Sequence, residues 1–170
     1  PNARALQIGT APHKNLSRVW KACTQLDCHL AIVGHETEEI LSLRSKHELS
    51  HSIHRSVSDE VLEQLYLHCD AVVFVSTHEG FGMPLIEAQV YGKPCVTSAI
   101  EPMKSNAGGG AILVDPIDTE AICTALKKAL KKPESNAKLI ESGHVNSKRF
   151  SGVEVARQHA GVYAEEIGNI

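Results

Sequence analysis

The stretch AVVFVSTHEGFGMPLIEAQVYGKPCVTS, Ala71 to Ser98, joins two short apolar runs through a glycine-rich loop and a segment that can form a helix. Short apolar runs bounded in this way are typical of strands buried in a parallel sheet. Pro84 fits the first turn of the intervening helix, because its missing N–H would have no intrahelical partner there. The stretch therefore predicts a strand–helix–strand unit of an α/β fold.

The same alternation continues on both sides of this stretch. We expect strands at Ala5 to Ile8, Leu30 to Val33, Ser52 to His54, Ala71 to Val75, Cys95 to Ser98 and Ala111 to Val114. About six strands with helical crossovers predict a Rossmann-like, doubly wound parallel sheet in a single domain, residues 1–170. Residues 1–132 would form the sheet with its covering helices, and residues 133–170 would add helices near 136–148 and 153–167.

Polar side chains that can cap helices mark further helix starts. Asn15 precedes one amphipathic segment, Ser58 or Asp59 precedes a second, and Asp118 precedes a third that ends in KKALKK. That lysine run is expected to be a solvated helix end, where cations oppose the negative helix terminus.

The composition excludes several classes of function. The 170 residues carry 17 Lys and Arg against 20 Asp and Glu, a formal net charge of -3, and no basic run is long enough to follow a nucleic-acid backbone. No apolar stretch approaches the roughly 20 residues that span a bilayer, and we expect neither a membrane-spanning segment nor a signal peptide. The five cysteines form no CxxC pair, so we expect buried free thiols in a soluble, cytoplasmic protein. Because the chain opens on Pro1 and its first apolar run follows almost at once, we also expect it to be a piece of a longer protein.

The strand order decides where a ligand should bind. In an open doubly wound sheet, ligands bind at the carboxyl ends of the strands where the order reverses, which for the order 3-2-1-4-5-6 lies between the first and fourth strands. The rule selects the loops GTAPHKN, Gly9 to Asn15, and STHEGFGM, Ser76 to Met83.

Both loops carry features that suit an anion. Gly9 lets the backbone approach a ligand closely, and Lys14 offers an ammonium group. Across the cleft, Gly80 and Gly82 permit close approach, and the helix that starts at Pro84 presents its positive dipole end. Together these features predict a diphosphate site.

Two glutamates in the second loop indicate sugar hydroxyls beside that diphosphate. A carboxylate next to a phosphate is repulsive unless hydroxyl groups lie between them, so Glu87 could hold a ribose and Glu79 a more distal sugar. Either glutamate alone is better explained structurally, Glu87 as a complement to the helix dipole and Glu79 as a solvated loop residue. Their joint placement with Lys14 favours a nucleotide-sugar.

The run FVSTHEGFGMPLIEAQVYGKPCVTS resembles the donor-binding motif of the family-4 retaining glycosyltransferases (glycosyl transferases group 1), in which seven residues separate two glutamates, here Glu79 and Glu87. The stretches IGTAPHKNL, VSDEVLEQLYLHCDAVVF and EPMKSNAGGGAILVDPIDTEAI match in the same order, so the resemblance covers roughly residues 5–130. It implies the C-terminal, donor-binding half of the two-domain GT-B architecture, with the N-terminal acceptor domain absent from this chain.

The resemblance also implies roles for individual residues. The catalytic residues would be Lys14, which would neutralise the diphosphate, and Glu79, which would contact the transferred sugar, while Glu87 would bind the ribose. The implied donor-binding set is Gly9, Thr10, Lys14, Arg55, Glu79, Gly80, Phe81, Gly82, Met83, Leu85 and Glu87. The implied reaction is metal-independent and needs no cofactor. It transfers a hexosyl unit from a UDP- or GDP-sugar, with retention, to a glycan or lipid-linked acceptor of a bacterial surface polysaccharide. The acceptor, and peripheral contact with the inner face of the membrane, would involve the other domain.

The sequence departs from the family pattern at two places. Many members carry an arginine just after the glycine of the first loop, where this chain has Thr10, so Lys14 and the helix ends must carry the phosphate charge. Many members also have a glycine near the third strand, where this chain has HSIHRSVSD. Arg55 or its neighbours would then line the base site, and the base stays open.

Three alternatives accompany this interpretation. HELSH, His47 to His51, fits the zinc-protease pattern HExxH, but its polar surroundings and the missing metzincin continuation argue against zinc hydrolysis. A non-catalytic nucleotide-sugar module and another GT-B enzyme, such as a sugar-nucleotide epimerase, also remain, because a fold does not determine a reaction.

Overall fold

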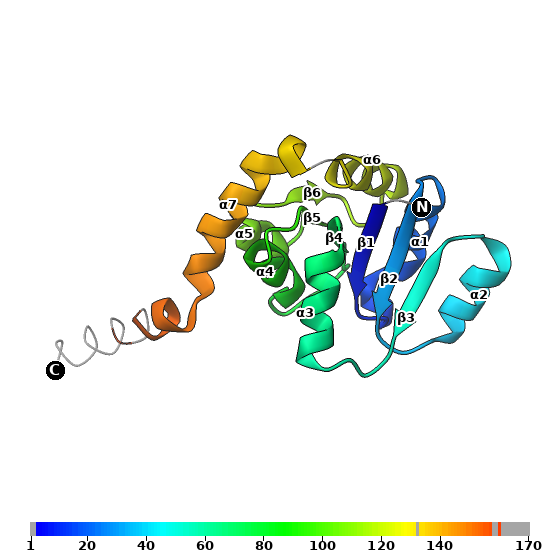
Figure 1. The fold of residues 1–170 in the computed structure, drawn as a ribbon, viewed down its shortest axis with the longest axis horizontal. Coiled ribbons are helices and arrows are strands. Elements are labelled where there is room, and N and C mark those ends of the chain that lie inside the picture. Colours follow the sequence, from blue (N-terminus) through cyan, green and yellow to red (C-terminus); the bar gives the residue numbers. More distant parts are fainter. Residues whose placement is uncertain (1–2, 132, 158–159, 161–170) are drawn as a thin grey trace.

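Six parallel strands form the central sheet of the computed structural model, which describes residues 3–131, 133–157 and 160 (Figure 1). The strands are β1 (Ala3–Ile8), β2 (Cys28–Val33), β3 (His51–His54), β4 (Ala71–Phe74), β5 (Cys95–Ser98) and β6 (Ile112–Val114). Their order is β3-β2-β1-β4-β5-β6, and every pairing is parallel. The predicted strands and the reversal of order between β1 and β4 are confirmed.

Helices cover both faces of this sheet (Figure 1). They are α1 (Leu16–Thr24), α2 (Glu38–Lys46), α3 (Asp59–His68), α4 (Met83–Val90), α5 (Met103–Ala107), α6 (Thr119–Ala129) and α7 (Ala137–Ser147). Short 3-10 turns lie at Pro12–Lys14, Pro133–Asn136 and Lys148–Phe150. One apolar core packs α1, α2 and α6 against the sheet, and a second packs α3, α4 and α5 against the opposite face. This is the predicted doubly wound α/β arrangement.

The strands are buried because both faces are covered. All four residues of β4 and all four of β5 are buried. Trp20 of α1 is fully buried in the first core, where its ring packs against His51 with centroids 4.8 Å apart. All five cysteines are buried and free, as predicted.

Two of the predicted caps are confirmed and one is wrong. The side chains of Ser58 and Asp118 accept hydrogen bonds from the third residue of α3 and α6 respectively. Asn15 precedes α1 as predicted, but its side chain makes no cap. Its amide instead donates to the carbonyls of Val75, at 2.9 Å, and Pro116, at 2.6 Å. Asn15 therefore ties the end of β4 to the segment before α6.

Of the two helices predicted after residue 133, the first is confirmed as α7, which packs on α4. Residues 152–157 of the second are helical, while 158–159 and 161–167 lie outside the described residues. Within the described ranges, no helix is long and apolar enough to cross a membrane.

The HELSH segment does not form the helix that a zinc protease needs. α2 ends at Lys46, His47 is extended with φ -141°, and His51 begins β3. The two histidines therefore do not share a helix face. In the part of the chain that the structure describes, no group of three or more His, Cys, Asp or Glu side chains could hold a metal ion.

Candidate functional site

The loops that follow β1 and β4 meet at the carboxyl edge of the sheet. The amide of Thr77 donates to the carbonyl of His13 at 2.8 Å, and Asn15 bonds the carbonyl of Val75. Parallel strands end at the same edge, so the side chains that follow β1 and β4 are brought together there. The predicted meeting of the two loops is observed.

Lys14 and Glu79 form an ion pair between these loops. The Nζ of Lys14 lies 2.6 Å from Oε1 of Glu79, and the two side chains are only 17% and 13% exposed. The ammonium also lies 5.0 Å from the centroid of the Phe74 ring, and Nε2 of His13 lies 3.9 Å from the same carboxylate oxygen. Without a ligand, Glu79 thus neutralises Lys14, and an incoming anion has to share or replace that carboxylate.

Two residues of β1 and its loop hold Lys14 in place. Gly9 has φ 93°, and a Cβ there would lie 2.9 Å from Cε of Lys14, so the lysine stem crosses directly over the glycine. The amide of Gln7, which is 1% exposed, donates to the carbonyl of Lys14 at 3.0 Å. Gln7 was absent from the predicted site, although a lone amide in the run ALQI is a signal that could have found it.

Thr10 packs against a second glycine that the sequence reasoning missed. A Cβ on Gly34, which follows β2, would lie 2.7 Å from Cγ2 of Thr10, and Gly34 has φ 147°. Thr10 therefore sits at the junction of the loops after β1 and β2, at the same sheet edge.

The glycine loop leads directly into α4. Gly82, with φ 92°, precedes the helix, and the side chains of Phe81 and Met83 are 41% and 53% exposed. The amide of Leu85 already donates to the carbonyl of Gly82 at 3.0 Å, and its side chain is buried, so a donor contact there needs this bond to open. Gly80 is exposed, and a Cβ added to it would have no other atom within 4 Å.

Gly80→Ala is expected to leave the free energy of unfolding within about 0.5 kcal/mol of the parent, because the added methyl meets open space. If a ligand approaches the backbone there, the same methyl should weaken its binding by about tenfold, the cost of a modest steric conflict. Urea denaturation and calorimetry measure the two effects. Gly152→Ala, where the space is equally open, is the matched control. Unchanged binding in Gly80→Ala would show that no ligand approaches this glycine.

Glu87 lies in the second turn of α4 and is held from α3. Its Oε2 accepts a hydrogen bond of 2.6 Å from the hydroxyl of Tyr66, whose ring stacks on Tyr91 with centroids 5.0 Å apart. Burial, and then the charge and hydrogen bond of Glu87, raise the pKa of Tyr66, so the hydroxyl stays a donor. Tyr66 was absent from the predicted site, so this contact was missed.

Arg55 lies just beyond β3, at the same edge of the sheet. Its side chain is 58% exposed and forms an ion pair with Glu36, which also pairs with Arg44. A role for Arg55 in binding a base stays a prediction.

The comparison with protein families adds an independent observation to this geometry. The family model for glycosyl transferases group 1 matches residues 5–145, which include both loops, Lys14, Glu79 and Glu87. The chain belongs to the glycosyl transferases group 1 family.

Curated relatives of this group 1 chain include mannosyltransferases. It is 30% identical over 107 residues to the O-antigen chain mannosyltransferase B of Escherichia coli, covering 63% of this chain and 28% of the relative. It is 27% identical to the MMP alpha-(1->4)-mannosyltransferase of Mycolicibacterium hassiacum, covering 98% of this chain and 43% of the relative. The chain thus spans less than half the length of these two relatives.

Solved structures share the fold of the group 1 chain. Sucrose-phosphate synthase from Thermosynechococcus elongatus matches with a TM-score of 0.82 at 20% identity, over 99% of this chain and 46% of that one. Anabaena HepE, solved in complex with UDP and glucose, matches with a TM-score of 0.77 at 19% identity, over 96% and 48%.

In this group 1 chain, the glycine loop is braced from the C-terminal side. The ring of Phe81 meets the edge of Phe150 with centroids 5.5 Å apart at 86°, and the amide of Asn106 donates to the carbonyl of Phe81 at 2.8 Å. Asn106 is tied in turn to Asn146 of α7, whose amide donates to the Asn106 carbonyl at 2.7 Å. The turn after α7 is therefore coupled to the loop that carries Glu79.

Phe150→Ala should loosen this loop and weaken nucleotide binding by about three- to tenfold, because an edge-to-face aromatic pair contributes about 0.5–1.5 kcal/mol. Calorimetry with UDP and GDP checks the expectation. Phe150→Tyr, which keeps the ring, should bind as the parent does, and equal losses in both variants would contradict the bracing role.

Proposed function

We propose that the chain is the donor-binding half of a retaining glycosyltransferase of the GT-B architecture. The complete enzyme would transfer a hexosyl unit from a UDP- or GDP-sugar to a glycan or lipid-linked acceptor. The observation that carries the proposal is the Lys14–Glu79 ion pair, which lies at the reversal of strand order and within the residues that the family model matches. An acceptor-binding domain outside this chain would supply the opposite wall of the cleft.

The geometry supports a specific order of groups along the donor. Lys14 and the N-terminus of α4 would bind the diphosphate, and Glu79, 2.6 Å from Lys14, would bind hydroxyls of the adjoining sugar. Glu87, held by Tyr66, would bind the ribose on the other side. On binding, Glu79 exchanges its ammonium partner for sugar hydroxyls while Lys14 turns to the phosphate.

These residues would contribute to the reaction by stabilising charge. Retaining transfer through an oxocarbenium-like transition state places negative charge on the departing diphosphate, which helps to accept the acceptor's proton. Once Lys14 has turned from Glu79 to the phosphate, the lysine and the helix N-terminus would stabilise that charge. No metal ion or other cofactor is part of this proposal.

The names of the relatives support a choice of sugar and setting. One is named an O-antigen chain mannosyltransferase and another a mannosyltransferase, so we propose mannose as the hexose and a bacterial surface polysaccharide as the product. The bound UDP in HepE keeps UDP beside GDP as the nucleotide to test. The complete enzyme would work in the cytoplasm, at the inner face of the membrane.

Calorimetric titration of UDP- and GDP-sugars into the chain tests this proposal. One of the two series should bind, and Lys14→Ala and Glu87→Ala should each weaken it. Lys138→Ala and Glu141→Ala, exposed charges on α7, serve as matched controls. The proposal fails if no nucleotide-sugar binds, or if both site variants bind as well as the parent.

The chain by itself is expected to bind its donor but to transfer no sugar, because the acceptor-binding wall lies in the other domain. A radiolabelled donor with a lipid-linked or glycan acceptor measures transfer, and the binding titration above confirms that the donor site is intact. Product formed by the chain alone would contradict the two-domain proposal.

A further inference from the structure

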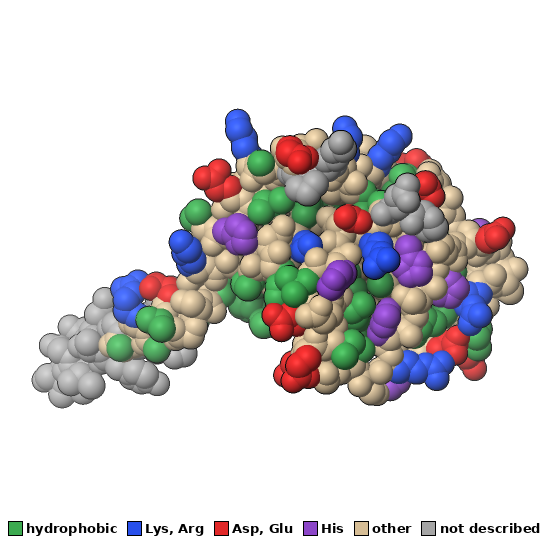
Figure 2. Space-filling model, in the orientation of Figure 1, with side chains coloured by type: hydrophobic (Ala, Val, Ile, Leu, Met, Phe, Trp, Pro, Cys, Tyr) green, Lys and Arg blue, Asp and Glu red, His purple; other side chains and the backbone are tan. Residues whose placement is uncertain are grey.

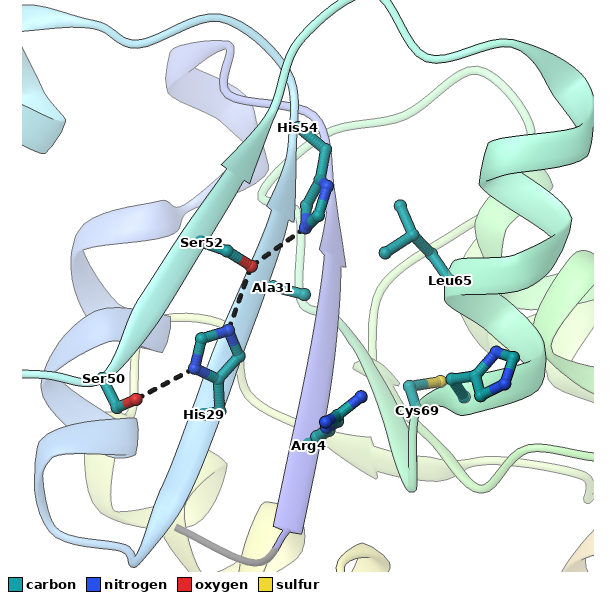
Figure 3. Close-up of a pocket in the computed structure, with 9 residues that line it drawn as sticks. Arg4, His29, Ala31, Ser50, Ser52, His54, Leu65 and Cys69 are labelled. Carbon is teal, nitrogen blue, oxygen red and sulfur yellow. Dashed lines mark hydrogen bonds between the residues drawn. The ribbon is translucent and has the colours of Figure 1, made fainter.

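A cavity of about 300 Å³ opens on the sheet face beside α3 (Figure 3). Its polar lining consists of Arg4, His29, Ser50, Ser52, His54 and His68. Arg4 and His29 lie near the starts of β1 and β2, whereas the Lys14–Glu79 pair follows the opposite ends of the strands. The cavity is thus separate from the candidate donor site.

Strand register explains why these polar side chains share one face. Ser52 of β3 pairs with Ala31 of β2, and alternate residues of a strand point to the same side, so His29, Ser52 and His54 all face the cavity. Figure 2 shows histidine side chains gathered over this part of the sheet. Side chains on a covered sheet face are normally apolar, as they are elsewhere in this fold.

A chain of hydrogen bonds fixes the imidazoles. Nδ1 of His29 lies 2.9 Å from the hydroxyl of Ser50, and Nε2 lies 3.0 Å from that of Ser52. The Ser52 hydroxyl continues to Nε2 of His54 at 2.9 Å. Both nitrogens of His29 are therefore engaged with rotatable hydroxyls, which can redirect their protons when a ligand arrives.

The lining carries cationic and donor groups without a carboxylate. Arg4 brings a permanent charge, and three imidazoles and two hydroxyls can donate hydrogen bonds. The nearby Asp70 accepts a bond of 2.7 Å from the backbone amide of Arg4 and is not part of the lining. Such a set of groups complements an anion. The volume of the cavity is at the lower end of the range for small-molecule sites.

We propose that this cavity binds a phosphate group, either free or as the end group of a phosphomonoester such as a hexose phosphate. Arg4 would pair with the phosphate oxygens, and His29 and His54 would donate to them once their bonds to Ser52 rearrange. Binding here does not depend on the proposed function, because the lining contains none of the residues of the implied donor-binding set, although His54 adjoins Arg55.

The protonation state of His29 should change when a phosphate binds, and this change can be measured. Burial first, and then coulombic repulsion from Arg4 and from the imidazoles of His51 and His54, lower the pKa of His29, so its imidazole is neutral near neutral pH. The other titratable groups around it are His68 and Cys69 in the lining and Asp70, which lies between α3 and β4. A bound phosphate opposes the Arg4 charge and favours the imidazolium, so His29 should gain a proton on binding, in addition to any proton that the phosphate itself exchanges.

Imidazole NMR signals, followed during titration with inorganic phosphate and with glucose 6-phosphate, test the proposal. The signals of His29, His54 and His68 should shift saturably, and Arg4→Gln and His29→Gln should each weaken binding by about tenfold, the usual loss of one charge-assisted bond. Lys138→Gln and His144→Gln on α7 should have no effect. Binding of both ligands would identify free phosphate as sufficient, and binding of the ester alone would identify a phosphomonoester.

Calorimetry in two buffers of different ionisation enthalpy measures the proton uptake, which His29→Gln should reduce relative to the parent. UDP binding should be unchanged in Arg4→Gln and His29→Gln, which separates this proposal from the donor site. Circular dichroism of each variant confirms folding. The proposal is overturned if neither ligand shifts these signals at millimolar concentration, or if the control variants lose binding equally.

Discussion

Lys14→Ala is expected to weaken binding of UDP or GDP by about ten- to hundredfold, the loss of a charge-assisted hydrogen bond worth about 1.5–3 kcal/mol. Lys14 is the candidate cation of the loop after β1, because Thr10 stands where many relatives have an arginine and therefore adds no charge. Its backbone carbonyl is held by Gln7, its stem crosses Gly9, and its ammonium lies 5.0 Å from the centroid of the Phe74 ring, so the side chain already lies beside the proposed phosphate site. Calorimetry of the bare nucleotide diphosphate isolates this contact from those of the sugar.

Glu79→Gln is the companion variant that sharpens this prediction. Removing its charge frees Lys14 from its ion pair, so the bare diphosphate should bind as well as in the parent or more tightly. The nucleotide-sugar should bind more weakly, because Glu79 no longer offers a carboxylate to the sugar hydroxyls. Parent-like binding of UDP and GDP by Lys14→Ala would contradict the assignment of the phosphate to this lysine.

Trp20→Ala is expected to lower the free energy of unfolding by about 3–5 kcal/mol, the usual cost of deleting a large buried aromatic side chain. Trp20 is 0% exposed and packs from α1 into the core beneath β1 and β2, with its ring against His51. Since a domain is stable by only about 5–15 kcal/mol, this variant should lie near the limit of folding.

Urea denaturation followed by circular dichroism measures the effect, because Trp20 is the chain's one tryptophan and its fluorescence is lost with it. Ile117→Ala, at a side chain 65% exposed, should stay within about 0.5 kcal/mol of the parent. A decrease of less than about 1 kcal/mol in the free energy of unfolding for Trp20→Ala would mean that α1 does not pack into this core as described.

The strands were predictable because the sheet is buried on both faces. AVVF of β4 and CVTS of β5 are short apolar runs bounded by turn residues, so the predicted bounds of β5 match the structure and the predicted β4 ends one residue late. Asn15 shows where such reasoning fails. A polar residue before a helix usually caps it, but here the carbonyls of Val75 and Pro116, distant in sequence, compete for the side chain.

Some residues of the candidate site could likewise be predicted from the sequence, and others could not. Lys14 and Glu79 could be placed together because strand order alone brings their loops to one edge. Tyr66 and Phe150 could not, because each contacts the site from an element whose packing no local pattern encodes. The sequence also does not show which glycines adopt an unusual backbone conformation: Gly9 and Gly82 have a positive φ, whereas Gly80 does not.

Chemical-shift mapping of the ¹⁵N-labelled chain with UDP and with GDP tests most directly whether the nucleotide binds between β1 and β4. With the nucleotide that binds, the amide signals of Gly9, Gly80 and Gly82 should shift together and saturate with one affinity, while that of Gly143, a buried residue of α7, should not move. Absence of shifts with both nucleotides, or saturable shifts confined to residues away from these loops, would contradict a donor site at this edge of the sheet.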